Sequence, residues 1–129
     1  MPVEIQMLVC SVALFAILIA IQATAATMQM GARQGLGNRD HVAPITGWAA
    51  RAQRCEDNQL VSLVLFAPLA LSVVLLKHTD HWSALGATLY LYARIGFAAC
   101  YLIGIPYLRT VCWAAGMAGI ALTGYALYV

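Results

Sequence analysis

Charged side chains are scarce in this sequence. Only 9% of the 129 residues are Asp, Glu, Lys or Arg, whereas 63% are hydrophobic. A soluble domain carries about 25% charged residues. Because one small core cannot bury this much apolar surface, a water-soluble domain is excluded and the lipid bilayer is the expected solvent.

Patterns for metal and nucleic-acid binding are also missing. Neither a CxxC motif nor a Cys/His metal spacing occurs among the four cysteines, which are Cys10, Cys55, Cys100 and Cys112. They are expected to be small buried hydrophobes, with a reactive thiol at Cys55 as the alternative. His78, Asp80 and His81 share one short turn, which is more typical of polar loop residues than of a metal site. No basic stripe indicates a nucleic-acid partner.

Four apolar stretches are each long enough to cross a bilayer, which takes about 20 residues. They cover residues 3–28, 58–76, 82–103 and 107–129, and a loop covers 29–57. Backbone groups in hydrocarbon must bond within their own segment, so these spans are helices. The predicted fold is therefore all-α, an integral membrane four-helix bundle that forms one domain over residues 1–129. The first stretch has no basic n-region and is interpreted as a retained span.

The distribution of positive charge predicts the orientation. Four arginines fall between the first and second spans, and Arg109 falls between the third and fourth. Only Lys77 lies between the second and third spans. Since basic loops stay in the cytoplasm, the first loop should be cytoplasmic and both termini should lie outside.

The second helix should start before the membrane, with Thr46 as its N-cap. Arg51, Arg54 and Asn58 then recur at spacings of three and four residues, so they share one helix face, and Val61 continues it. A solvated helix end whose arginines reach toward headgroups is the alternative.

The third helix carries a charge deep in an apolar span. Arg94 lies in the stretch YLYARIGFAACYLIGIPYLRT, where a central charge costs roughly 2.5–3.5 kcal/mol and should face a partner in the bundle. Glu56 or Asp57 is the expected counter-charge. Tyr101 follows at helical spacing, and Arg109 opens the fourth helix.

These polar residues should gather near the cytoplasmic side; they are Arg51, Arg54, Asn58, Arg94, Tyr101 and Arg109. Arginine forks bind carboxylates, and positive charge favours a thiolate. Such an inventory suits a small anionic peptide with a thiol, such as glutathione, although a phospholipid headgroup or another acid would also fit.

The combined pattern resembles the MAPEG family, membrane-associated proteins in eicosanoid and glutathione metabolism. The likeness rests on four short spans, on RAQR followed by Asn58, and on the IPYLRT wording, which is most similar to bacterial members. It implies a homotrimer of four-helix subunits in a bacterial inner membrane. Glutathione would then bind between adjacent subunits near the cytoplasmic face.

The resemblance also implies roles for single residues. Arg54 and Asn58 match the arginine and asparagine that hold glutathione, and Arg51 matches a further arginine one turn earlier. Arg94 matches a basic residue of the third helix. Tyr101 matches a tyrosine that contacts glutathione.

Positions in the first loop, the second helix and the fourth helix complete the comparison. Arg109 matches the arginine that activates the thiol. Arg33 or Arg39 matches a first-loop arginine. The sequence departs from the family where Val61 replaces a glutamate that meets the glutathione amino group, and where Val64 replaces a common proline.

Two functions are therefore favoured for the chain. The first is a membrane-embedded glutathione-dependent transferase or peroxidase that acts on lipophilic electrophiles, with Arg109 as the catalytic residue and glutathione as co-substrate. The second is a non-catalytic ligand-binding protein or companion subunit of the same fold in a larger membrane complex, which Val61 favours. A small exporter is a third alternative, but its proton exchange needs an acid within a span.

Overall fold

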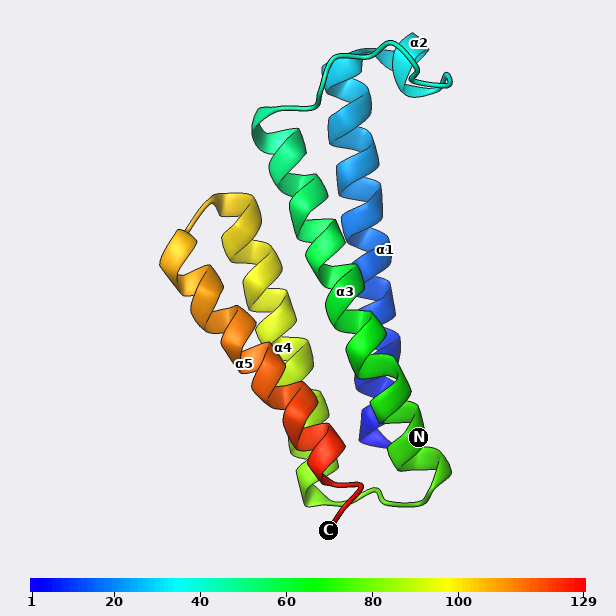
Figure 1. Ribbon diagram of the computed structural model, residues 1–129, viewed down its shortest axis with the longest axis vertical. Helices are drawn as coiled ribbons and strands as arrows, with labels where there is room; N and C mark the ends of the chain where they lie inside the picture. The colour runs from blue at the N-terminus through cyan, green and yellow to red at the C-terminus, as the bar shows by residue number, and fades with distance from the viewer.

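The computed structural model describes residues 1–129, all of which fall into helices, turns and short connections (Figure 1). The helices are α1 (Val3–Met30), α2 (Ala32–Gly35), α3 (Gly47–Leu75), α4 (His81–Ile103) and α5 (Pro106–Tyr125). The all-α prediction is confirmed. Helix α2 is a single turn within the loop predicted at 29–57.

Three of the helices, α1, α3 and α4, are long and apolar enough to cross a membrane. They cover the first three predicted spans apart from Leu76, which follows the last residue of α3. The fourth predicted span corresponds to α5, which begins with Pro106 and carries Arg109 in its first turn. A fourth crossing by α5 stays a prediction.

Two helix ends differ in detail from the sequence expectation. Thr46 occupies the N-cap position of α3, but its hydroxyl makes no capping bond. Instead Gln29 pairs with it: the Thr46 N–H donates to Gln29 Oε1 at 3.0 Å, and Gln29 Nε2 donates to the Thr46 carbonyl at 3.1 Å. The second difference is at the C-terminal end of the chain, where α5 stops at Tyr125 rather than at residue 129. After Tyr125, backbone N–H groups bond three residues back, as Leu127 does to the Gly124 carbonyl, which makes a tighter turn than an α-helix.

Helices α4 and α5 form a tight antiparallel hairpin. A Cβ atom added to Gly119 would stand 2.6 Å from the Tyr90 backbone nitrogen and 2.7 Å from the Gly86 carbonyl oxygen. Only small residues allow two helix backbones to come this close. Gly104, in the left-handed region at φ 96°, ends α4 and lets the chain reverse.

The hairpin packs against the pair formed by α1 and α3 (Figure 1). One buried cluster, centred on Phe66, Tyr90 and Ile120, fills the half of the molecule near the termini. A second, which includes Leu18 and Phe97, lies nearer the loop between α1 and α3. Both termini lie at one end of the molecule and that loop lies at the opposite end, with the α4–α5 turn in the same half as the loop but short of that end.

The end that holds the termini contains a buried acid that the sequence did not single out. Asp80 and Ser83 form a capping box at the start of α4. The Ser83 hydroxyl also donates to the carboxylate of Glu4, which is almost fully buried. This contact ties the first turn of α1 to the first turn of α4.

Candidate functional site

A cavity of about 260 Å³ opens between α3, α4 and α5 near the α4–α5 turn. We call it the arginine cavity; it is lined by Asn58, Phe97, Tyr101, Arg109, Thr110 and Trp113. Three of the six predicted site residues therefore meet in one place: Asn58, Tyr101 and Arg109. They come from three different helices.

The position of Arg109 follows from the start of α5. Pro106 stands at the first helical position, where its fixed φ suits a helix start, and Arg109 follows within the first turn. The Arg109 guanidinium carbon lies 4.6 Å from the centre of the Tyr101 ring. This cation–π contact is worth about 0.5–1 kcal/mol at a partly exposed site. It places the Arg109 charge and the Tyr101 ring side by side in the cavity.

Arg94 lies behind the cavity and is only 2% exposed. Its Nε donates to Gln59 Oε1 at 2.8 Å, and its Nη2 donates to Asn58 Oδ1 at 2.9 Å. The guanidinium also covers the Phe97 ring, at 4.2 Å from the ring centre. Arg94 does not line the arginine cavity itself.

The predicted counter-charge for Arg94 is wrong. Its partners are two neutral amides, not Glu56 or Asp57. The reason is the rotation of α3, because each residue turns a helix by about 100°. Gln59 is fully buried and faces α4, whereas Glu56 is half-buried and Asp57 is exposed.

A chain of buried polar groups continues from Gln59 toward α1. Gln59 Nε2 donates to Ser11 Oγ at 3.1 Å, and Ser11 Oγ donates to the Tyr90 hydroxyl at 3.4 Å. The Tyr90 hydroxyl also shares a hydrogen bond of 3.1 Å with Ser62 Oγ. Every fully buried side-chain nitrogen and oxygen atom has a partner. A satisfied buried network of this kind rigidifies the helices that it joins.

Sequence reasoning missed most of this network. Gln59, Ser11, Ser62 and Tyr90 are not among the residues that the sequence pattern singles out. The signal was present, because polar residues within apolar spans usually mark contacts between helices. Their pairing could not be read from spacing, since it depends on how α1, α3 and α4 are rotated.

Arg51 and Arg54 lie outside the arginine cavity. The Arg51 guanidinium occupies the space where a side chain on Gly104 would begin, next to the C-terminal end of α4. Positive charge is favoured there because the last carbonyls of a helix are partly negative. Trp48, one turn earlier, donates to the Leu102 carbonyl at 3.0 Å. Arg54 is exposed.

A second cavity, of about 190 Å³, adjoins the first along α3 and α5. We call it the apolar cavity; it is lined by Asn58, Val61, Ser62, Leu65, Trp113 and Met117. Asn58 and Trp113 line both cavities. Val61, where the resemblance implies a glutamate, is 62% exposed and reaches the groove beside Asn58.

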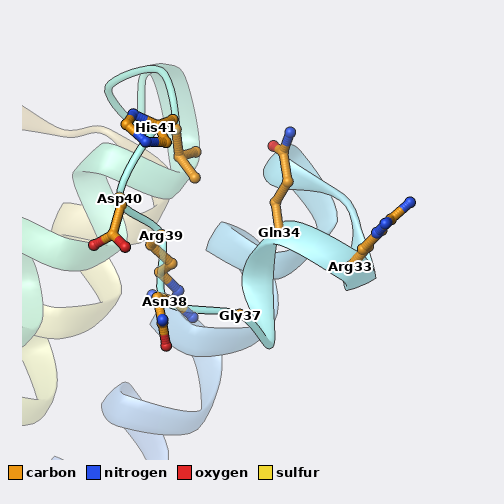
Figure 2. A pocket seen from close by; sticks show the side chains of 8 residues that line it. Arg33, Gln34, Gly37, Asn38, Arg39, Asp40 and His41 are labelled. Carbon is orange, nitrogen blue, oxygen red and sulfur yellow. The ribbon is translucent and has the colours of Figure 1, made fainter.

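The loop after α1 forms a wider pocket of about 440 Å³, but its side chains do not converge. In Figure 2 the side chains of Arg33 and Gln34 point away from Asp40. Arg39 donates through Nε and Nη2 to the Gly35 carbonyl, at 2.9 and 2.8 Å, so its guanidinium holds the loop together. Cys55, the candidate reactive thiol, is fully buried in the core.

Comparison with known proteins gives one match. The model of the MAPEG family matches residues 7–129. No curated protein and no solved structure matches the chain. The match covers nearly the whole sequence, and three helices are able to cross a membrane. The chain is therefore an integral membrane protein that belongs to the MAPEG family.

Proposed function

We propose that the protein is a membrane-embedded, glutathione-dependent transferase or peroxidase that acts on lipophilic electrophiles. The observation that carries the proposal is the meeting of Asn58, Tyr101 and Arg109 around one cavity. They are three of the six residues that the family resemblance assigns to the glutathione site; Arg51, Arg54 and Arg94 do not line this cavity. Membership of the family supports the same reading.

In this proposal Arg109 acts on the glutathione thiol. A positive charge beside a thiol favours the thiolate, which is the nucleophilic form. The Tyr101 ring beneath the guanidinium holds the charge at the cavity wall. Asn58 and Tyr101 orient the bound peptide, so the protein contributes position and charge while glutathione supplies the sulfur.

The two reactions use that sulfur differently. In transfer, the thiolate forms a bond to an electrophilic carbon, and the group on that carbon leaves with the electron pair of its bond. In reduction of a hydroperoxide, two glutathione molecules supply two electrons and become the disulfide, while the hydroperoxide becomes an alcohol and water. The part of the apolar cavity along Leu65 and Met117 would receive the lipophilic partner from the bilayer.

The proposed assembly is a homotrimer of four-span subunits with the site completed by a neighbouring protomer. The exposure of Val61 and Trp113 in the groove supports a site that is open in the single chain. The proposed location is a bacterial inner membrane, with the arginine-rich loop in the cytoplasm and both termini outside. Labelling of cysteines introduced at each terminus in intact cells tests this orientation.

A second candidate function is non-catalytic ligand binding, alone or as a companion subunit. It is favoured by Val61, because an isopropyl group cannot accept a hydrogen bond from the glutathione ammonium. Binding would then rely on Asn58, Tyr101 and Arg109 alone, without activation of the thiol.

Calorimetric titration of the purified protein with glutathione tests both candidates. We expect binding in the wild-type chain, a thiolate absorbance band in the near ultraviolet, and loss of that band in Arg109→Gln. Lys77→Gln removes the same charge at the opposite end of the molecule and should change neither result. Binding without thiolate absorbance would favour the non-catalytic function, and no binding at millimolar glutathione would refute the glutathione proposal.

A further inference from the structure

The buried Arg94 has only neutral hydrogen-bond partners. Its two bonds go to the amide oxygens of Gln59 and Asn58. Glu56 and Asp57, the acids closest to these two residues in the sequence, are not among its partners. A buried cation is usually paired with an anion, because taking a charge out of water is costly. Arg94, directly behind the arginine cavity, therefore has hydrogen bonds and the Phe97 ring around its charge but no anionic partner.

The contact with Arg94 also determines the orientation of the Asn58 amide. A guanidinium group has only donors, so the Asn58 atom that faces it must be the oxygen. The amide NH₂ group then points away from Arg94. Because Asn58 lines both cavities, its NH₂ is the part left for a ligand. A hydrogen bond from a charged donor also polarises the amide, so these N–H groups become better donors to an anion.

Gln59 holds Arg94 in this position. The same rule turns Gln59 Oε1 toward Arg94 Nε, which leaves Gln59 Nε2 to donate to Ser11 on α1. Tyr90 and Ser62 complete the network on the far side. A line of four side chains thus runs from α1 to the cavity wall: Ser11, Gln59, Arg94 and Asn58.

We infer that Arg94 and Gln59 are positioning residues that make the arginine cavity selective for anions. Arg94 fixes Asn58 with its donor group toward the ligand, and the charge of Arg94 is compensated when a carboxylate occupies the cavity. Because Gln59 is neutral, it leaves the charge of Arg94 available to an anion in the cavity. The inference rests on the proposed function for the identity of the ligand, glutathione, but not for the preference for carboxylates.

The substitution Gln59→Glu tests the inference with almost no change in shape. One oxygen of the introduced carboxylate still accepts from Arg94 Nε, and Ser11 can turn its hydroxyl to donate to the other oxygen. The pair then has no net charge. A nearby opposite charge changes ionisation equilibria by a factor of ten or more, so we expect the affinity for glutathione to fall about tenfold. The matched control is Gln53→Glu, which adds the same charge on the exposed face of α3 and should leave affinity within about twofold.

The charge of the ligand separates this role from a structural one. Gln59→Glu should weaken binding of glutathione but spare its diethyl ester, in which both carboxylates are neutral. Arg94→Met removes the charge by another route and also frees the Asn58 amide, so it should weaken binding of the acid more than binding of the ester; it serves if Gln59→Glu does not fold. Equal loss for the acid and the ester, or no loss for the acid in either variant, would overturn the inference.

Hexanoate, a simple carboxylate, separates this inference from the proposed function. Binding can be followed through the fluorescence of Trp113, in proteins where Trp48 and Trp82 are replaced by phenylalanine. If hexanoate binds and Gln59→Glu weakens it while glutathione does not bind, the inference stands and the glutathione proposal fails. If glutathione binds but neither ligand responds to Gln59→Glu, the proposed function stands and the inference fails. If neither ligand binds, both are refuted.

Discussion

The exposed valine beside Asn58 gives the sharpest test of where glutathione binds. Val61 is 62% exposed and lines the apolar cavity next to Asn58. The family resemblance places at this position a glutamate that meets the glutathione ammonium. Val61→Glu should therefore add one carboxylate to the groove without disturbing the core, and it should tighten glutathione binding.

The size of the effect follows from the exposure of the position. Opposite charges 4 Å apart attract by about 1 kcal/mol in water and about 4 kcal/mol near a protein surface. Exposed ion pairs usually yield about 0.2–1 kcal/mol, because side-chain ordering and salt offset the attraction. Since Val61 is mostly exposed, we expect about 1 kcal/mol, which corresponds to roughly fivefold tighter binding.

Calorimetry with two ligands measures this effect. Glutathione should bind about fivefold more tightly to Val61→Glu than to the wild-type protein. N-acetylglutathione lacks the ammonium, so the added carboxylate should repel it and leave its affinity unchanged or lower. Val61→Gln, which is similar in size and uncharged, is the matched control. Identical isotherms for glutathione in wild type and Val61→Glu, or a gain for both ligands, would refute the placement of the amino group beside Val61.

Three further outcomes are expected. Arg109→Gln should reduce the rate of any glutathione-dependent reaction by about tenfold or more, measured with a chromogenic electrophile; an unchanged rate would exclude Arg109 from catalysis. Gly119→Ala should lower the free energy of unfolding by about 1–3 kcal/mol, because its Cβ would meet the Tyr90 backbone. An unchanged melting temperature in detergent would contradict the tight α4–α5 contact. Trp48→Phe should lower the free energy of unfolding by about 1 kcal/mol, because the hydrogen bond to the Leu102 carbonyl is lost. Denaturant unfolding with no change in this free energy would show that the bond contributes nothing.

Much of the fold was predictable from the sequence. Long apolar stretches in a bilayer must be helical, so the positions of α1, α3 and α4 followed within a few residues. The start of α3 near Thr46, well before the apolar run, was also correct. The end of α5 was not, because the last turns of a chain depend on local hydrogen bonds that composition does not specify.

The candidate site was only partly predictable. Helical spacing correctly placed Tyr101 after Arg94 on one face of α4, and the proline break correctly placed Arg109 at the start of α5. Spacing could not tell that Arg51 would pack on Gly104, outside the cavity. It also gave no reason to choose Gln59 over Asp57 as the partner of Arg94.

By itself, the sequence determined that this protein lies in a lipid bilayer and where its helices run. It also determined which polar residues share a helix face. The reason is that apolar length and the 3.6-residue period are local properties of the chain. Only the tertiary structure decided which faces meet. Contacts such as that between Gly86 and Gly119 fix how close the helices lie, and helix rotation then brings Asn58, Tyr101 and Arg109 around one cavity with Arg94 behind them.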